Sequence, residues 1–378
     1  MVKIVLTGLN GYGGNYTDPL LKTDGSYKLA AVVSRNPVKS PHYERLREMQ
    51  VHFYDVLETC LERENPDMVI ITTPMHLHFE EVMCALRKGI SVYCEKPLAV
   101  NTTQCRQISK LAKEMGCLAV VGYQWSHSKA VTMLKKDILS GRYGKLQKIK
   151  TLAVWSRPKS YYAGSDWKGR HYGQGGKLIQ ESVVSNGASH FLHNLLFLSG
   201  EALNQAAEPV HIYGEAYRAH EIETFDTACI KMETDSGCEL LYMATLSAGT
   251  NHTPEFIMEC ETAIIVYPAG ENKEIAAKQK NTGELIYYGC PDEERFEHFK
   301  KVVDALSDRG KVNCDADTVL PVTKVCDWIM EKGKVIDFPK ERIVEDGDRL
   351  YVEGLETFMR ECYTEEKMFS EMGRIDSV

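Results

Sequence analysis

The sequence predicts two domains: an α/β domain with a doubly wound parallel sheet, followed by an α+β domain with a large, mostly antiparallel sheet. The chain has 378 residues, more than a single hydrophobic core usually serves. Short apolar runs alternate with helical patterns up to about residue 125, whereas strand-like runs follow one another beyond about residue 145. We therefore expect a first domain over residues 1–125 and a second over residues 126–378.

The first domain opens with an apolar run over residues 2–7, a glycine-rich turn and a helical stretch to about residue 21. A second apolar run completes a βαβ unit. Because the strand runs are apolar throughout, they are typical of a parallel sheet that helices cover on both faces. The expected strands after the first lie near 28–33, 51–54, 67–72, 90–94 and 118–122, and the expected helices lie over 55–63, 76–88 and 102–115.

In the second domain, consecutive strand patterns joined by turns predict a mostly antiparallel sheet. A glycine-rich segment leads into a helix around residues 187–198, and the last hundred residues return to helical patterns. The expected strands cover 146–155, 210–218, 225–233, 238–247, 254–260 and 262–267, and the later helices lie near 292–307, 316–332 and 346–362.

Composition limits the partners of the chain. A formal net charge of −8 disfavours nucleic acid and anionic membranes as partners, and no run approaches the roughly 18 apolar residues of a membrane helix. We expect a cytoplasmic protein with a small-molecule partner.

The 12 cysteines lack C-x-x-C spacing, so we expect reduced thiols. We also expect no metal site, because His76 and His78 are two residues apart and have no third ligand in reach.

A glycine-rich loop between the first strand and the first helix is the first candidate site. Gly8, Gly11 and Gly14 fit a G-x-x-G-x-x-G pattern, with Asn10, Tyr12 and Gly13 between them. Glycines let the backbone turn tightly and approach a diphosphate, whose charge meets free N–H groups at a helix start. At the first βα junction the pattern predicts a dinucleotide-binding Rossmann domain. The alternative interpretation is a simple turn.

The end of the second strand suggests which dinucleotide is bound. NAD-binding domains usually carry an acidic residue there for the ribose 2′-hydroxyl, but this chain has Ser34 and Arg35. A guanidinium suits a 2′-phosphate, so the sequence favours NADP over NAD. Arg35 could equally stack on the adenine or face solvent.

Three further segments resemble the glucose–fructose oxidoreductase / inositol dehydrogenase (Gfo/Idh/MocA) family. They are a T-P-x-x-x-H motif at 73–78, an E-K-P motif at 95–97, and a glycine pair at 175–176 followed by residues 186–190. The likeness spans nearly the whole chain and weakens after residue 200. It implies an NAD(P)-binding Rossmann domain followed by a substrate-binding and oligomerisation domain.

The resemblance also implies roles for single residues. Thr73, Pro74 and His78 would line the cofactor cleft, while Glu95 and Lys96 would face the nicotinamide and its ribose. The Lys96–Pro97 bond is expected to be cis. A lysine beside a cationic nicotinamide would have a lowered pKa and could exchange a proton with a substrate hydroxyl. The alternative for Lys96 is a surface lysine paired with Glu95.

His190 matches the histidine that the family carries in a D-x-x-x-H arrangement, but here Asn186 replaces the acid. Since asparagine cannot accept a proton, Lys96 and His190 would share the acid–base work, and Asn186 would orient a substrate hydroxyl or the imidazole. Glu181, nearby in sequence, could compensate. The alternative for His190 is a packing histidine.

The remaining candidates concern the substrate. Gln124 follows the sixth strand and fits a nicotinamide or substrate contact, while Ser126 stands where many members carry an arginine, which disfavours a carboxylate substrate. Aromatic and polar residues near the start of the second domain suit the faces of sugars, or simply fill a core. The candidate substrate-binding residues are Trp155, Arg157, Trp167, His193 and Asn194.

The leading functional hypothesis is hydride transfer between a nicotinamide cofactor and a secondary alcohol carbon of a sugar, glycoside or polyol. A second hypothesis is redox-neutral glycoside cleavage or epimerisation with a tightly bound cofactor. A third is a non-catalytic NADP-sensing protein. Because family members commonly pair through the open face of the second domain's sheet, the resemblance implies a homodimer or homotetramer.

Overall fold

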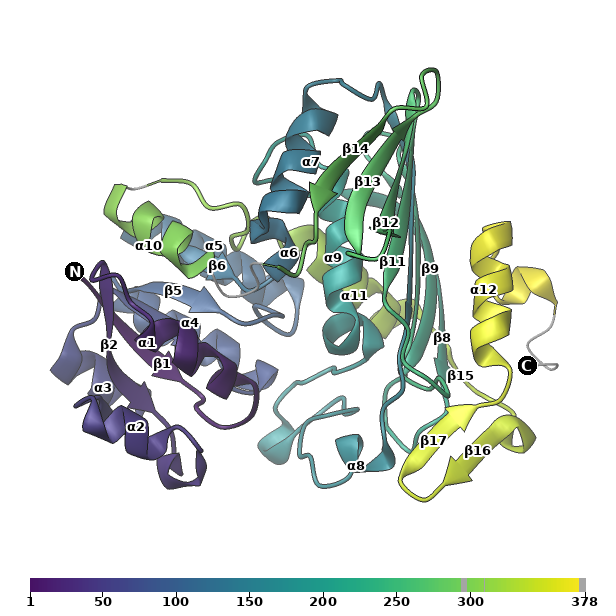
Figure 1. Cartoon of the computed structure of the whole chain (residues 1–378). Helices are drawn as coiled ribbons and strands as arrows, with labels where there is room; N and C mark the ends of the chain where they lie inside the picture. The colour runs from purple at the N-terminus through teal and green to yellow at the C-terminus, as the bar shows by residue number, and fades with distance from the viewer. Residues whose placement is uncertain (294–297, 309, 374–378) are drawn as a thin grey trace. The chain divides into compact units, whose positions relative to one another are not determined.

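The computed structural model describes residues 1–293, 298–308 and 310–373. The chain forms two compact units (Figure 1). The first contains Met1–His127 and the described residues of 294–320, and the second contains the remainder. The chain thus passes from the first unit to the second after His127, close to residue 125. It returns to the first unit once, within residues 294–320, and no sequence pattern indicates this return.

The first unit is built on a parallel sheet of six strands in the order β3-β2-β1-β4-β5-β6, the order of a Rossmann domain. All neighbouring pairs are parallel, and every residue of β4 and β5 is buried. The predicted doubly wound sheet is therefore confirmed. The strands are β1 (Val2–Thr7), β2 (Tyr27–Val33), β3 (His52–Tyr54), β4 (Met68–Ile71), β5 (Ser91–Cys94) and β6 (Ala119–Val121).

Helices connect these strands, and one helix from late in the chain joins them. Val302 and Val303 of α10 are buried in the same core as Ile4, Leu6 and Ile70 of the sheet, so α10 is part of this unit. The described helices are η1 (Gly11–Tyr16), α1 (Thr17–Leu21), η2 (Pro37–Lys39), α2 (Tyr43–Glu48), α3 (Leu57–Glu64), α4 (Met75–Arg87), α5 (Thr102–Met115), α6 (Gln124–His127) and α10 (His298–Asp308).

The second unit contains a nine-stranded sheet in the order β14-β13-β12-β11-β7-β10-β9-β8-β15. Within the described residues its neighbours pair antiparallel, except β7 with β10 and β8 with β15, so the prediction of a mostly antiparallel sheet is confirmed. The strands are β7 (Leu146–Val154), β8 (Pro209–Arg218), β9 (Thr227–Thr234), β10 (Glu239–Thr245), β11 (Glu255–Cys260), β12 (Ala263–Ala269), β13 (Glu274–Gln279), β14 (Leu285–Gly289) and β15 (Val335–Asp337).

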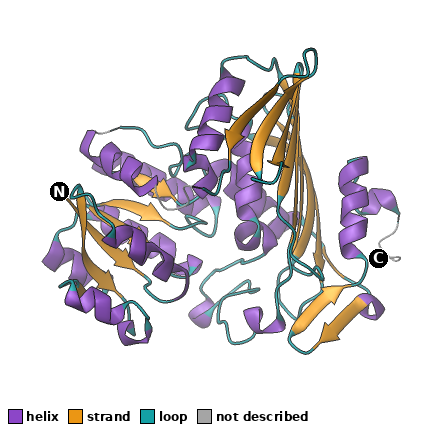
Figure 2. Cartoon of the chain, in the orientation of Figure 1, coloured by secondary structure: helices purple, strands orange, loops and turns teal. Residues whose placement is uncertain are grey.

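Helices lie on both faces of this sheet (Figures 1 and 2). We call the face of the sheet that α11 covers the inner face, where Trp328 and Ile329 lie against Gly214 of β8. We call the opposite face, which α12 covers, the outer face, and Phe358 and Met359 share a core with it. The helical segments of the second unit are α7 (Lys129–Leu139), α8 (Lys159–Tyr162), η3 (Gln174–Gly176), the π-helix η4 (Val183–Gly187), α9 (Ser189–Leu198), α11 (Leu320–Lys332), η5 (Lys340–Arg342), α12 (Leu355–Glu365) and η6 (Ser370–Met372).

The predicted tail helix over 346–362 is wrong in its first half. Residues 343–352 form the hairpin of β16 (Ile343–Asp346) and β17 (Arg349–Val352), and α12 starts only at Leu355. Gly347 is the first residue of the two-residue turn between Asp346 and Arg349. Its φ is +60°, which glycine adopts readily at this position of a hairpin turn. The helix predicted over 292–307 is present from His298, and residues 294–297 lie outside the described residues.

The helix predicted over 316–332 begins later, at Leu320, because Asp315 closes a turn ahead of it. The carboxylate of Asp315 accepts hydrogen bonds from the amides of Asp317 and Thr318, each at 3.0 Å. A side chain that satisfies these amides offers the backbone an alternative to the helix.

The cysteines, all within the described residues, form no disulfide, and eight of the 12 are buried. Across the part of the chain that the structure describes, no helix combines the length and apolar character needed to cross a membrane.

Candidate functional site

The glycine loop packs so closely on the end of β4 that two of its glycines leave no room for a side chain. A Cβ on Gly13 would lie 1.8 Å from the carbonyl oxygen of Gly8 and 2.3 Å from Oγ1 of Thr72. Gly8 has φ +81° and meets Thr72 in the same way. Thr72 in turn donates its hydroxyl to the Thr7 carbonyl at 2.5 Å, so it fixes the loop against the sheet.

Gly11 has a different role in the loop. Its φ is +71°, and a Cβ built on it would meet nothing within 4 Å. The backbone is thus exposed at this point, as the approach of a diphosphate requires. The helix that follows is short, since a 3₁₀ turn over Gly11–Tyr16 precedes the five residues of α1. The exposed backbone amides, rather than a long helix dipole, are therefore the feature that suits an anion.

The end of β2 lies against this loop. Asn10 donates its side-chain amide to the carbonyl of Asn36 at 3.1 Å, which ties the loop to the segment carrying Ser34 and Arg35. The Arg35 side chain is exposed. Since Val33 pairs with Tyr54 in parallel register, Asp55 of the neighbouring strand stands at the same edge of the sheet as Ser34. A carboxylate is thus present at this edge, directly after β3 rather than after β2.

The T-P-x-x-x-H and E-K-P segments are held together by His78. Its ring is buried, with Nδ1 at 2.7 Å from the Pro97 carbonyl and Nε2 at 2.8 Å from the Thr73 carbonyl. Burial lowers the pKa of His78. The buried ring therefore lies between the two loops. Thr73 also donates its hydroxyl to Glu81 at 2.7 Å. Pro74 precedes α4 as its N-cap.

Glu95 lies in a buried polar cluster at the end of β5. Tyr16 donates its hydroxyl to one carboxylate oxygen, and the backbone amide of Lys96 donates to the other at 3.1 Å. Burial first, and then the charge of Glu95, raise the pKa of Tyr16 well above its usual value. Glu95 is thus a buried acceptor that fixes the backbone on which Lys96 stands, and the Lys96–Pro97 bond is cis.

Gln124 completes this edge of the sheet. Its side-chain amide donates to the Tyr12 hydroxyl at 2.7 Å, so the end of β6 is joined to the glycine loop. The predicted cofactor residues of the first unit accordingly lie after β1, β2, β4, β5 and β6. The carboxyl ends of parallel strands are where open α/β sheets bind their ligands.

In the second unit, Asn186 is bound to a buried carboxylate. Asn186 lies in the π-helical turn η4, which Ser182 caps through a reciprocal pair of hydrogen bonds with Ser185. Its Nδ2 donates to Oε1 of Glu181 at 2.8 Å. The Glu181 side chain is only 1% exposed, and its Oε2 accepts from the backbone amide of Gly169. Glu181 thus connects Asn186 to the loop that follows α8.

Aromatic rings and cations gather beside this pair. The Arg157 guanidinium lies 5.3 Å from the ring centre of Trp155 and 5.6 Å from that of Tyr161. The Lys168 ammonium lies 5.9 Å from the Trp167 ring and 3.7 Å from the Tyr161 ring. Burial and the charge of Glu181 raise the pKa of Tyr161 to about 12. The cluster therefore combines flat apolar faces with hydrogen-bonding groups.

The remaining candidates lie on α9. His190 is half-buried, whereas His193 and Asn194 are buried. The His193 ring stacks on Phe197 with centroids 5.7 Å apart, and Asn194 Oδ1 accepts no hydrogen bond within the described residues. His193 and Asn194 therefore lie in the interior of the second unit.

Sequence reasoning missed Tyr16, Thr72 and Asp55, and named Glu181 only as a nearby acid. No spacing rule connects Tyr16 to Glu95, 79 residues further on, or Thr72 to Gly8. Asp55 follows a strand, which was the only available signal. Among the residues that the structure describes, no three His, Cys, Asp or Glu side chains are grouped so that they could hold a metal ion.

The comparisons with known proteins agree with this arrangement. The chain matches, over residues 2–123, a family described as an oxidoreductase family with an NAD-binding Rossmann fold (Gfo/Idh/MocA). It is 34% identical over 90 residues to 2,7-anhydro-N-acetylneuraminate hydratase of Mediterraneibacter gnavus, covering 24% of each chain. It is 27% identical over 146 residues to inositol 2-dehydrogenase/D-chiro-inositol 3-dehydrogenase of Lactiplantibacillus plantarum, covering 38% of this chain and 42% of that relative. These alignments span less than half of either relative.

Similarity to solved structures extends over most of the chain. The WlbA dehydrogenase from Bordetella pertussis, determined with NADH and UDP-GlcNAcA, aligns with a TM-score of 0.70 at 19% identity, over 87% of this chain and 95% of that chain. The fold is therefore that of a two-domain protein with an NAD-binding Rossmann domain and a second domain built on a large sheet. Residues 2–123 thus match the Gfo/Idh/MocA oxidoreductase family, which confirms the resemblance found in the sequence motifs.

Proposed function

We propose that the chain is an NAD(P)-dependent oxidoreductase that transfers hydride between nicotinamide and a secondary alcohol carbon of a sugar, glycoside or polyol. The observation that carries the proposal is the loop after β5, where the buried Glu95 binds the amide of Lys96 in a domain whose family is NAD-binding. Two relatives named above are an inositol dehydrogenase and a dehydrogenase determined with a sugar nucleotide, which supports this substrate class.

Lys96 is the proposed proton-exchanging group. Bound nicotinamide would supply the hydride acceptor or donor. Lys96 would take the hydroxyl proton as the alcohol is oxidised, or return it in the reverse direction. Glu95 would hold the backbone of Lys96 in place, and Tyr16 would hold Glu95. Thr73, Pro74 and Gln124 would line the nicotinamide half of the cofactor site, and Asn10, Tyr12 and the glycines would surround the diphosphate.

Asn186 and His190 are the proposed hydroxyl-binding groups of the second unit. Because a carboxylate oxygen can only accept, the amide of Asn186 must turn its NH₂ toward Glu181, and its Oδ1 therefore faces the other way. We assign this oxygen to a substrate hydroxyl. His190 would act as the second acid–base group, since neither orientation of an asparagine accepts a proton.

The proposed substrate face is formed by Trp155, Tyr161 and Trp167, with Arg157 across two of these rings. Flat rings suit the apolar faces of sugars, while the polar groups at their edges suit hydroxyls. His193 and Asn194 would support the position of α9 from behind.

For the cofactor, we propose that Arg35 decides in favour of NADP. Its side chain is exposed at the end of β2, where a guanidinium can bind a 2′-phosphate. Asp55, at the end of β3, would oppose this preference by repelling the phosphate. The ratio of kcat/KM for the two cofactors measures the balance.

We also propose that two copies of the chain pair through the outer face of the nine-stranded sheet. Leu285 pairs with Lys278, and Lys278 pairs with Ile264, so the three share one face. Leu285, Ile264 and the neighbouring Tyr287 are 52%, 41% and 54% exposed, so pairing through this face would remove three large apolar side chains from water. Size-exclusion chromatography with light scattering tests this, and a monomer at micromolar concentration would contradict it.

A second candidate function is a redox-neutral reaction in which the cofactor stays bound and is oxidised and reduced within one cycle. The observation that favours it is the match to a hydratase, since hydration changes no net oxidation state. Nucleotide that remains with the protein through dialysis would favour this candidate over a dehydrogenase that releases its cofactor.

A panel of sugars, glycosides and polyols tests the proposal when reduced nicotinamide is followed by absorbance with each cofactor. The Lys96→Met variant should lose activity by about two to four orders of magnitude while it keeps its affinity for the cofactor. Normal turnover by this variant would contradict the mechanism. Cofactor binding with no turnover on any substrate would instead indicate an NADP-sensing protein.

A further inference from the structure

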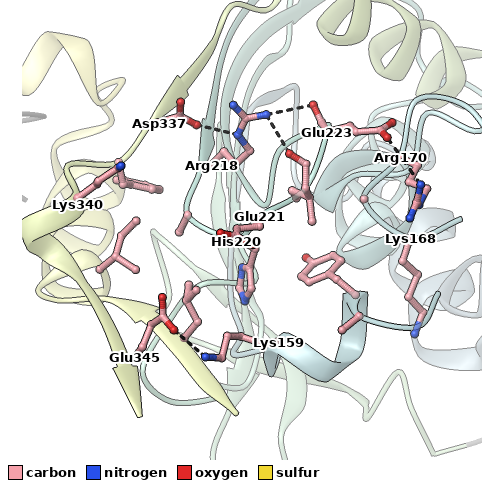
Figure 3. A pocket seen from close by; sticks show the side chains of 18 of the residues that line it. Lys159, Lys168, Arg170, Arg218, His220, Glu221, Glu223, Asp337, Lys340 and Glu345 are labelled. Atoms are coloured by element: carbon pink, nitrogen blue, oxygen red, sulfur yellow. Dashed lines mark hydrogen bonds and ion pairs between the residues drawn. The ribbon is translucent and has the colours of Figure 1, made fainter. Parts of the chain in front are cut away.

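A cavity of about 870 Å³ lies wholly within the second unit. Three segments line it: residues 159–170, residues 218–223 and residues 337–350. Figure 3 shows its charged side chains converging from these segments. Its volume falls in the range of small-molecule sites. None of the residues assigned above to hydride transfer lines this cavity.

Basic residues outnumber acidic residues in its wall. Three ion pairs account for most of the charge: Lys159 with Glu345 at 2.6 Å, Arg218 with Asp337 at 2.7 Å, and Arg170 with Glu223 at 3.9 Å. The basic residues are Lys159, Lys168, Arg170, Arg218 and Lys340, and the acidic residues are Glu221, Glu223, Asp337 and Glu345.

Two lysines of the wall form no ion pair within the described residues. Lys340 is exposed at the rim, and Lys168 is half-buried. The Lys168 ammonium lies over the Tyr161 ring at 3.7 Å, and burial lowers the pKa of this lysine. An anion beside a partly desolvated ammonium gains more than one beside a fully hydrated one. Figure 3 draws Lys340 and Lys168 on opposite sides of the cavity, with Arg218 and His220 between them.

The wall also offers apolar and neutral surface. Tyr162, Phe338 and Leu350 line it, and rings and aliphatic side chains suit the faces of a sugar. The paired ions present both donors and acceptors, which suits several hydroxyl groups. His220 takes no part in binding, because Nδ1 lies 3.0 Å from Asp226 and Nε2 lies 3.1 Å from the Arg157 carbonyl.

We infer that this cavity binds a saccharide unit that carries an anionic group, either a carboxylate or a phosphate. The segment 159–170 forms its wall and also carries Tyr161 and Gly169, which contact the Glu181–Asn186 pair. The inference deepens the proposed function. It rests on that function only in treating the anionic saccharide as part of the substrate.

Ligand-observed NMR titrations with D-glucuronate, D-glucose 6-phosphate and D-glucose test the inference on the full chain. At least one anionic sugar should bind, its affinity should exceed that of glucose by about tenfold or more, and added salt should weaken it. Glucuronate binding alone would identify a carboxylate site, and glucose 6-phosphate binding alone a phosphate site.

Variants locate the binding. Lys340→Gln should lower the affinity for the anionic sugar about threefold to fivefold, as expected for an exposed charge pair. Combining it with Lys168→Met should lower the affinity further. Lys334→Gln is the matched control, since this exposed lysine precedes the cavity wall and does not line it. The inference is overturned if no sugar binds, if glucose binds equally well, or if the double variant binds like the wild type.

These outcomes are separable from the proposed function, which is tested by cofactor binding and turnover. Anionic sugars that bind to a chain without oxidoreductase activity would leave the cavity assignment standing. Turnover of neutral polyols with no anionic sugar bound would leave only the proposed function.

Discussion

The side-chain amide of Asn186 donates a hydrogen bond of 2.8 Å to Oε1 of Glu181. Where the family resemblance leads one to expect an aspartate, the chain thus carries an asparagine bound to a buried glutamate. The carboxylate has not been lost from this region. It lies five residues earlier in the chain, at Glu181, and its hydrogen bond fixes which way the asparagine faces.

Replacing Glu181 with glutamine should reduce turnover more than it reduces cofactor affinity. The new amide can accept from only one of the two N–H groups that Glu181 now binds, those of Asn186 and Gly169. A buried donor without a partner costs about 1–3 kcal/mol. Asn186 can avoid this cost only by turning its Oδ1 toward the new NH₂ and away from the substrate, so we expect kcat to fall about tenfold or more. The surface variant Glu353→Gln should behave like the wild type. An unchanged kcat for Glu181→Gln would show that the pair does not orient Asn186.

Two adjacent glycines should respond differently to alanine. A Cβ on Gly13 would lie 1.8 Å from the Gly8 carbonyl, whereas a Cβ on Gly14 finds its closest neighbour at 3.4 Å. Gly13→Ala must displace the loop and should cost about 1–3 kcal/mol of unfolding free energy, together with a large loss of cofactor affinity. Gly14→Ala should bind cofactor almost normally. Equal behaviour of the two variants in calorimetry and thermal unfolding would refute the proposed loop packing.

Arg35→Asp should shift cofactor preference toward NAD. The change removes a cation and adds an anion where a 2′-phosphate would lie, so the affinity for NADP should fall by about tenfold or more relative to NAD. Arg106→Asp makes the same charge change on α5, away from the glycine loop, and should leave the ratio of the two dissociation constants unaltered. The assignment fails if both variants keep the wild-type ratio.

His127 should make the stability of the protein depend on pH. Burial is the largest effect on its pKa and Lys301 adds to it, while the carbonyl of Val121 acts against both, and the pKa falls from 6.5 to about 4. Between about pH 6.5 and pH 4, His127 is therefore protonated in the unfolded chain but neutral in the folded chain. The contribution of neutral His127 to the free energy of unfolding is fully present above about pH 6.5 and is lost as the pH falls toward 4.

The expected loss is about 2 kcal/mol between about pH 7.5 and pH 5. His127→Gln, which can still donate to the Val121 carbonyl but does not titrate, should be less stable at neutral pH and show a shallower pH dependence. Urea unfolding at the two pH values measures this difference. Parallel pH profiles for wild type and variant would indicate that His127 is not the titrating group.

The order of the strands in the first unit could be predicted from the sequence because most of them are short, largely apolar runs. β4 and β5 are buried on both faces, which gives the clearest pattern that a strand can have. In the second unit, the sequence does not predict β13, because Glu274–Gln279 is rich in alanine and charged residues, which have low strand propensity. Its pairing with β12, rather than its own composition, makes it a strand.

The candidate site was predictable only where short motifs mark it. The glycine loop, the residues around Lys96 and the segment with His190 are all local patterns, and the motifs indicated them directly. The Tyr16–Glu95 and Asn186–Glu181 hydrogen bonds depend on where the chain folds back on itself, and no local pattern contains that information. The His78 ring shows the same limit, since its position in a motif does not reveal that both nitrogens face backbone carbonyls.

Isothermal titration calorimetry of nucleotide-free protein with NADP and with NAD tests the central claim most directly. The account predicts saturable binding of at least one of the two, at one site per chain, and a severe loss of that binding in Gly13→Ala. Absence of binding for both nucleotides, in protein shown by mass spectrometry to retain none, would contradict it.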